Sequence, residues 1–317
     1  MNQEIKVSVS CITFNHAPFI QKCLEGFLMQ QVNFRFEILI HDDASTDGTQ
    51  EIIAGFQQRY PDIIFPLLQK VNQYRNGVRG MNPKFNFPRA KGKYIALCEG
   101  DDYWTDPLKL QKQVDFLESN PDVVLCGHDS VLVNKNDEII QPTALEESQK
   151  KDCSGSDLQR CFGILTQTMC FRNMPGIKAM PKEAFQISNG DKFLISFLGQ
   201  FGSYKYLPEV KPSAYRLHDG GIWSATSLLN RKKMMTNTYA KIRDYYSGVN
   251  NSQMVFFHGK KAFHYSKEAL KLSFRSNTGV SEKVASIISF IKSNRALTSP
   301  ILFFKIVFSR VNKIVYQ

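Results

Sequence analysis

Residues 36–48 read FEILIHDDASTDG, an apolar, β-rich run that ends in a polar turn containing three aspartates. A similar run, IKVSVSCITF, occupies residues 5–14, and the residues between the two runs have helical periodicity over 17–31. The chain is therefore predicted to open as a β-α-β unit.

The polar turn leads into a helix predicted over residues 49–59, for which Asp47 and Gln50 have the spacing of a capping box. Further strands are predicted at 63–68, 93–98, 122–133 and 166–172, and helices at 107–120 and from 191, with a long functional loop at 70–92 and a polar insertion at 134–155. This alternation indicates an α/β fold with a Rossmann-like, mostly parallel central sheet flanked by helices. Ligands of such sheets lie at the carboxyl ends of the strands.

Composition places the chain among ordinary globular proteins. Of its 317 residues, 43% are hydrophobic and 22% are charged, which excludes the disordered and fibrous classes. The seven cysteines are scattered without a C-x-x-C pair, so we interpret them as reduced thiols of a cytoplasmic protein. Residues 1–14 contain Glu4 and no long apolar segment, so we interpret them as a first strand and do not expect export.

The net charge of +11 is distributed unevenly. From residue 211 onward there are 18 Lys and Arg against 4 Asp and Glu, whereas the first 210 residues hold 22 against 25. A basic C-terminal part of this kind can bind nucleic acid or anionic lipid. Because the basic residues are spread over several predicted helices and no nucleic-acid motif is present, we favour lipid and expect no nucleic-acid partner.

Three carboxylates follow the predicted strand at 93–98 within four residues, as Glu99-Gly100-Asp101-Asp102. Their mutual repulsion is unfavourable unless a cation is present. Carboxylate oxygens suit Mg²⁺ or Mn²⁺, and an open coordination shell can bridge a diphosphate. The cluster therefore predicts a metal-diphosphate site.

The pair Asp42-Asp43 ends the strand at 36–41, and its sequence alone does not separate two interpretations. Aspartates in such turns frequently only cap helices. However, Asp47 can already supply a cap, and a carboxylate at the open edge of the sheet can accept hydrogen bonds from a base or a ribose. We therefore keep both aspartates as candidate nucleotide-binding residues.

Several motifs in one order resemble the family 2 inverting glycosyltransferases, which have the GT-A fold. These motifs are VSVSCITFN at 7–15, HDDASTDGT at 41–49, LCEGDDYW at 97–104 followed by Asp106-Pro107, Gly190-Asp191 at a helix start, and YRLHDGG at 215–221. The resemblance implies a metal-dependent hexosyltransferase of bacterial surface-polysaccharide assembly. It also implies a catalytic domain over 1–222, with a nucleotide-sugar half at about 1–106 and an acceptor half at about 107–222, and a basic helical extension over 223–317.

The resemblance also implies roles for individual residues. Asp191 would be the general base, and Asp101 and His218 would hold Mn²⁺ or Mg²⁺. The nucleotide sugar, conventionally linked to UDP, would be bound by Thr13, Phe14, Asp42, Asp43, Glu99, Asp102 and Arg216. Two positions depart from the family pattern. Glu99 stands where an aspartate is usual, and Gly190 stands where an acidic residue often precedes the base.

Histidines and helix-start aspartates also have purely structural interpretations. A plain N-cap is the structural alternative for Asp191, and we expect His41, His128, His258 and His264 to be surface or core residues. His218 differs because two glycines follow it closely and Arg216, two residues earlier, offers a phosphate partner.

Residues 299–316, SPILFFKIVFSRVNKIVY, have the pattern of a helix with one narrow polar face. The apolar run is too short to span a bilayer but can lie in its interface. We therefore predict a peripheral protein at the inner face of the cell membrane, with a glycan or lipid-linked glycan acceptor. The alternatives are packing on the catalytic domain and a homo-oligomer contact through the C-terminal helices.

Two other functions are compatible with parts of this sequence. A nucleotidyltransferase that makes activated sugars would share the sheet and the metal site, but its glycine-rich basic loop is replaced here by Asn15-His16-Ala17-Pro18. A non-catalytic glycan-binding protein on the same fold would not need Asp101, Asp191 and His218.

Overall fold

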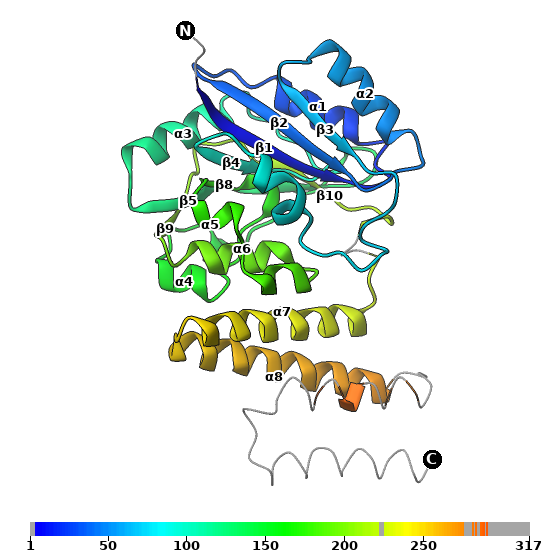
Figure 1. The fold of residues 1–317 in the computed structure, drawn as a ribbon, viewed down its shortest axis with the longest axis vertical. Coiled ribbons are helices and arrows are strands. Elements are labelled where there is room, and N and C mark those ends of the chain that lie inside the picture. The colour runs from blue at the N-terminus through cyan, green and yellow to red at the C-terminus, as the bar shows by residue number, and fades with distance from the viewer. Residues whose placement is uncertain are drawn as a thin grey trace. The chain divides into compact units, whose positions relative to one another are not determined.

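The structure is a computed structural model that describes residues 4–221, 225–275, 281, 283, 286–288 and 290. The chain divides into two compact units, one comprising residues 1–186 and 190–219 and the other comprising 187–189 and 220–317. The first unit contains the sheets and six α-helices among its described residues (Figure 1).

The first unit is built on a seven-stranded sheet with the order β3-β2-β1-β4-β8-β5-β9. Its strands are β1 (Ile5–Thr13), β2 (Arg35–Asp42), β3 (Ile64–Leu68), β4 (Tyr94–Leu97), β5 (Val123–Gly127), β8 (Cys170–Arg172) and β9 (Ser203–Tyr206). All pairs are parallel except those that β8 makes with β4 and β5. The predicted mostly parallel α/β sheet is confirmed.

Helices lie around this sheet (Figure 1), and the first three along the chain contribute buried residues to its hydrophobic core. They are α1 (Ile20–Leu28), α2 (Thr49–Arg59), α3 (Lys109–Ser119), α4 (Gly155–Gln159), α5 (Pro175–Lys178) and α6 (Gly190–Leu198). Val7, Val9 and Cys11 of β1 alternate along the strand, and all three belong to one buried cluster with Leu24 and Phe27 of α1. Their burial removes apolar surface from water and holds the carboxyl ends of β1, β2 and β4 in register.

The predicted single strand at 122–133 is wrong, because the structure divides it between two sheets. Residues after β5 turn at His128-Asp129, and β6 (Ser130–Val133) joins a small sheet of order β10-β6-β7 with β7 (Ile139–Gln141) and β10 (Ser213–Arg216). The buried Asp129 carboxylate causes the break, since it accepts hydrogen bonds from the backbone N–H groups of Ser130, Ala144 and Leu145. None of these N–H groups belongs to β5 or to the strands that pair with it, so the chain turns away from the large sheet at Asp129.

The predicted capping box at Asp47 and Gln50 is also wrong. Gly48, with φ of 100°, precedes α2, and Gln50 Nε2 donates to Asp42 Oδ1 (2.5 Å) and to the Gln69 carbonyl (3.0 Å). Asp47 instead accepts from the backbone of Ala17 (2.9 Å) and Thr49 (3.1 Å). Both side chains therefore form hydrogen bonds with other partners, and the reciprocal hydrogen bonds of a capping box are not formed.

The predicted loop at 70–92 contains two short helical turns, Asn82–Asn86 of π type and Phe87–Arg89 of 3₁₀ type. Asn86 is fully buried, and its amide donates to Ser10 Oγ and to the carbonyls of Cys11 and Leu39. The end of this segment is thus fastened to β1 and β2.

The second unit contains the long helices α7 (Leu228–Gly248) and α8 (Ser252–Arg275), joined by a short turn (Figure 1). They pack through aromatic side chains: the ring of His258 stacks on Tyr246 at 5.5 Å and on Tyr239 at 5.8 Å. The predicted C-terminal helices are confirmed, while the helix predicted at 299–316 lies outside the described residues. Among the helices that the structure describes, none combines the length and apolarity needed to cross a bilayer.

Candidate active site

The acidic turn Glu99–Asp102 follows β4 at the carboxyl edge of the parallel strands, directly beside the end of β1. The Gly100 N–H donates to the Ile12 carbonyl (3.0 Å), and a Cβ at Gly100 would lie 2.6 Å from Thr13 Oγ1. Only glycine therefore lets the turn approach β1 this closely. Thr13 Oγ1 is itself buried and has no hydrogen-bond partner in the described chain, which is consistent with its predicted role as a donor-substrate contact.

Two histidines converge on Asp101. His218 Nε2 lies 3.0 Å from Asp101 Oδ2 and His16 Nε2 lies 3.7 Å from the same oxygen. The His218 ring also packs on Phe19 at 4.8 Å and meets the His16 ring edge-on at 5.8 Å. Burial raises the pKa of Asp101, but the His218 hydrogen bond and the two imidazoles outweigh it and hold that pKa below its usual value.

The environment of the other two carboxyl groups of the turn, those of Glu99 and Asp102, disfavours their charged forms. Burial, with Asp101 and Asp191 nearby, raises the pKa of Glu99 to about 8, and burial together with Asp101 and Glu99 raises the pKa of Asp102 well above its usual value. Asp102 Oδ2 is buried without a partner in the described chain. Such a cluster is stabilised by a cation, because the cation offsets both the repulsion and the missing hydrogen bond.

The residues present fit a divalent cation. Ligand atoms of Glu99, Asp101 and Asp102 lie within 4.8 Å of one another, and so do those of His16, Asp101 and His218. Asp101 belongs to both sets. The structure thus brings the two predicted metal residues, Asp101 and His218, together.

Asp191 lies in the first turn of α6, on the acceptor half of the predicted catalytic domain. Its charge contributes to the raised pKa of Glu99, so the fold brings its carboxyl close to the acidic turn although 92 positions separate Asp191 from Glu99 in the sequence. Asp191 is half-buried, and its role as the general base stays a prediction.

Arg216 is buried and makes several contacts within the protein, in addition to its predicted role as a phosphate partner. Its side chain is only 2% exposed, its backbone N–H donates to Asp102 Oδ1 (2.8 Å), and its Nε donates to the Asp101 carbonyl (2.8 Å). The guanidinium also pairs with Asp137 at 2.6 Å and lies over the Phe19 ring at 4.6 Å. In this structure Arg216 holds the acidic turn in position, and its contact with phosphate stays a prediction.

The predicted nucleotide residues Asp42 and Asp43 are both buried at the end of β2. Asp42 accepts hydrogen bonds from Gln50 and from the backbone and hydroxyl of Ser45. Asp43 accepts from the backbone N–H groups of Gln73 (2.7 Å) and Tyr74 (3.0 Å). Asp43 therefore shapes the following loop, and direct contact of either carboxylate with a nucleotide stays a prediction.

The loop held by Asp43 brings Arg75 over the ring of Phe14, at 5.6 Å from its centroid. Phe14 is half-buried at the end of β1, next to Thr13. Sequence reasoning did not single out Arg75, because nothing in a loop rich in asparagine and glycine indicates which residue returns to the first strand. The arrangement places a cation beside the predicted nucleoside pocket.

His16 is the second residue that sequence reasoning missed. A histidine directly after a strand end, at the ligand edge of the sheet, was an available signal. The expectation for His41 and His128 is confirmed, since both are buried outside the acidic cluster. His41 stacks on Phe85 at 4.2 Å, and His128 Nδ1 lies 2.8 Å from the Asp129 carbonyl.

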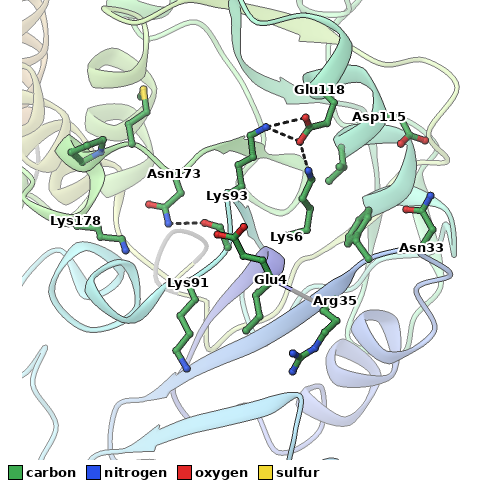
Figure 2. Close-up of a pocket in the computed structure, with 16 residues that line it drawn as sticks. Glu4, Lys6, Asn33, Arg35, Lys91, Lys93, Asp115, Glu118, Asn173 and Lys178 are labelled. Carbon is green, nitrogen blue, oxygen red and sulfur yellow. Dashed lines mark hydrogen bonds and ion pairs between the residues drawn. The ribbon is translucent and has the colours of Figure 1, made fainter. Parts of the chain in front are cut away.

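A cavity of about 850 Å³ opens at the opposite, amino ends of β1 and β2 (Figure 2). Two of its lysines, Lys6 and Lys93, point toward Glu118 and pair with it at 2.6 and 2.9 Å. No residue predicted for the active site lines this cavity. The candidate site and the cavity therefore belong to different ends of the sheet.

The fold and the order of the motifs are those of the GT-A class, and the comparison with known proteins agrees. Residues 8–178 match the glycosyl transferase family 2, and the chain belongs to this family. A curated relative, an uncharacterized protein of Mycobacterium tuberculosis, is 36% identical over 226 residues, which are 71% of this chain and 63% of the relative. The matched part thus spans less than two thirds of that relative's length.

Other relatives and structures agree with this placement. The putative teichuronic acid biosynthesis glycosyltransferase TuaG of Bacillus subtilis is 30% identical over a segment that covers 35% of this chain and 41% of the TuaG chain. Among solved structures, S. aureus TarS 1-349 in complex with UDP has a TM-score of 0.62 at 16% identity, covering 97% of this chain and 87% of its own. The Pyrobaculum calidifontis mannosyltransferase PcManGT, in complex with GDP-Man and Mn²⁺, has a TM-score of 0.59 at 14% identity, covering 94% and 89%. These two structures support the fold.

Proposed function

We propose that this protein is an inverting, metal-dependent glycosyltransferase that moves a sugar from a nucleotide sugar, UDP-linked, to a hydroxyl of a glycan acceptor. The observation that carries the proposal is the convergence of Asp101, His218 and Glu99 at the carboxyl edge of the sheet, with Asp191 within electrostatic range of Glu99. The UDP complex of TarS supports the choice of nucleotide.

In the proposed reaction, Asp191 removes the proton of the acceptor hydroxyl while that oxygen attacks the anomeric carbon from the face opposite the diphosphate. The C–O bond to the diphosphate breaks as the new glycosidic bond forms, so the configuration at the anomeric carbon inverts. A bound Mn²⁺ or Mg²⁺, held by Asp101 and His218, would stabilise the charge that develops on the leaving nucleoside diphosphate. Arg216 keeps Asp101 and Asp102 in place for this role.

The acceptor is proposed to be a lipid-linked glycan of a surface polysaccharide, with the protein held peripherally at the cytoplasmic face of the membrane. The excess of basic residues after position 210 supports this, because such segments are attracted to anionic lipid. The name of the relative TuaG points to the same kind of pathway. Homo-oligomer formation through the C-terminal helices remains a further proposal.

The test is a screen of nucleotide sugars with the full chain, scored by the nucleoside diphosphate released with and without Mn²⁺. We expect release of UDP from a UDP-sugar that depends on the metal and is lost in Asp101→Asn. Consumption of a nucleoside triphosphate with release of pyrophosphate would instead identify a nucleotidyltransferase. Binding of donors without any turnover would identify a glycan-binding protein on a transferase fold.

A further inference from the structure

We propose that His16 is a third protein ligand of the cation, so that His16, Asp101 and His218 form a two-histidine, one-carboxylate site. The proposal rests on the function proposed above and adds to it a preference for Mn²⁺ over Mg²⁺. His16 lies just after β1, Asp101 after β4 and His218 after β10, so three separate segments supply the three ligands.

The distances between the three side chains agree with a shared metal. Ligands about 2.1 Å from one ion lie about 3.0 Å apart at right angles and about 3.4 Å apart in a tetrahedron. Asp101 Oδ2 lies 3.0 Å from His218 Nε2 and 3.7 Å from His16 Nε2. The nitrogens and the oxygen all lie within 4.8 Å of one another, so small side-chain shifts complete the geometry.

The His16 ring makes no hydrogen bond that would explain its burial. Its side chain is 13% exposed, Nδ1 is buried without a partner in the described chain, and 3.7 Å from Nε2 to Asp101 is too long for a hydrogen bond. Buried polar side chains normally have such a partner. A metal on Nε2 would give the ring a partner on the side that faces Asp101, while Nδ1 stays without one in the described chain.

The backbone around His16 is fixed before any metal binds. The N–H of His16 donates to Thr49 Oγ1 (2.9 Å), that of Asn15 to Ser45 Oγ (2.8 Å), and that of Ala17 to Asp47 (2.9 Å). The His16 carbonyl accepts from Phe19 and Ile20 at the start of α1, both at 2.8 Å. A rigid ligand position of this kind reduces the entropy lost on binding.

The ligand chemistry sets the expected preference. Imidazole nitrogens suit transition metals, whereas Mg²⁺ prefers oxygen ligands and keeps its waters. The competing set, Glu99, Asp101 and Asp102, offers only oxygens, and Asp102 Oδ1 is already taken by the Arg216 N–H. The two sets therefore predict different metal selectivity, which makes them distinguishable.

The experiment measures binding of Mn²⁺ alone to the full chain, from the free Mn²⁺ signal in electron paramagnetic resonance, with Mg²⁺ as a competitor. We expect His16→Ala to weaken Mn²⁺ binding by about tenfold or more and Mg²⁺ binding much less. His16→Gln, which replaces nitrogen by an amide group of similar reach, should narrow the preference for Mn²⁺. His264→Ala, which removes an exposed imidazole from the other compact unit, should change neither affinity.

A second readout is independent of affinity. Pulsed resonance of bound Mn²⁺ should detect two directly coordinated imidazole nitrogens in the wild type and one in His16→Gln, and thermal melts check that each variant is folded. Unchanged nitrogen coupling in His16→Gln, or equal loss of Mn²⁺ and Mg²⁺ in His16→Ala, would overturn the assignment of His16. Undiminished Mn²⁺ binding in Asp101→Asn would instead contradict the metal site of the proposed function itself.

Discussion

Among single residues, Asp191 is the proposed general base, and this role requires its side-chain carboxylate. It lies in the first turn of α6 and helps to raise the pKa of Glu99. Asp191→Asn is nearly isosteric, and asparagine still suits a helix start. We expect donor affinity to be retained while the transfer rate falls by about a hundredfold or more, the usual scale for a general base.

The measurement is single-turnover transfer together with equilibrium binding of the nucleotide sugar. Asp157→Asn, which changes an aspartate in the first turn of α4, serves as the matched control and should leave transfer unchanged. Loss of donor binding together with transfer in Asp191→Asn would show that Asp191 acts on the structure of the site.

Among the elements, the turn between β6 and β7 connects two parts of the site. Asp137 in this turn pairs with Lys22 of α1 (2.8 Å) and with the buried Arg216 (2.6 Å), which in turn holds the Asp101 carbonyl. Asp137→Asn should lower the free energy of unfolding by about 1–2 kcal/mol, because it removes the opposite charge beside the buried Arg216 guanidinium. The loss stays below that of a fully buried pair, since the Asp137 side chain is 35% exposed.

The same variant should raise the Mn²⁺ concentration needed for half-maximal transfer, since Asp101 loses part of its support. Urea unfolding and a metal titration test the two effects. The control is Asp152→Asn, whose ion pair with Lys205 lies at the surface and is worth about 0–1 kcal/mol. Equal effects of the two substitutions would contradict a special role for the β6–β7 turn.

Helix α3 carries a fully buried lysine that makes stability depend on pH. Lys109 Nζ donates to Gln113 Oε1 (2.7 Å) and lies over the Trp104 ring at 4.1 Å, and burial lowers its pKa to about 8. The unfolded chain, in which the lysine pKa is about 10.4, therefore binds more protons between pH 8 and 10.4. Stability contributed by this site should rise across that range, by on the order of 3 kcal/mol.

Urea unfolding of the wild type and Lys109→Met from pH 7 to 10 isolates this contribution. The difference in unfolding free energy between the two proteins should shift in favour of the wild type as the pH rises. A difference that is constant with pH would mean that Lys109 keeps its ordinary pKa in the fold.

For the whole molecule, the charge asymmetry and the apolar segment at 299–316 predict attachment to a membrane surface. Removal of residues 299–317 deletes three basic residues and a broad apolar face, so binding to anionic liposomes should fall. Transfer to a water-soluble acceptor analogue should survive. Binding of the intact chain should also weaken with salt, because screening shortens the reach of its basic residues.

Lys305→Gln with Lys313→Gln keeps the apolar face and should reproduce part of the loss in a liposome sedimentation assay. If the truncated chain aggregates while the intact chain shows no affinity for vesicles, the segment serves a protein contact and the membrane proposal fails.

The sequence by itself determined the class of fold and the acidic turn. Apolar runs such as 36–41, each followed by polar residues, predict buried parallel strands whose carboxyl ends carry the ligands, and this follows from local periodicity alone. Glu99, Asp101 and Asp102 could be identified for the same reason, because adjacent residues after one strand must share one edge of the sheet.

Only the tertiary structure decided what lies across from that turn. His16, Asp137 and Arg75 come from distant loops, and their neighbours depend on how β1, the β6–β7 turn and the loop at 70–92 return to one edge. The predicted strand at 122–133 and the capping box at Asp47 failed for the same reason: Asp129 and Gln50 are satisfied by partners outside their own segments. Local sequence reports backbone propensity, whereas the hydrogen-bond partners of a buried polar side chain are set by the packing of the whole unit.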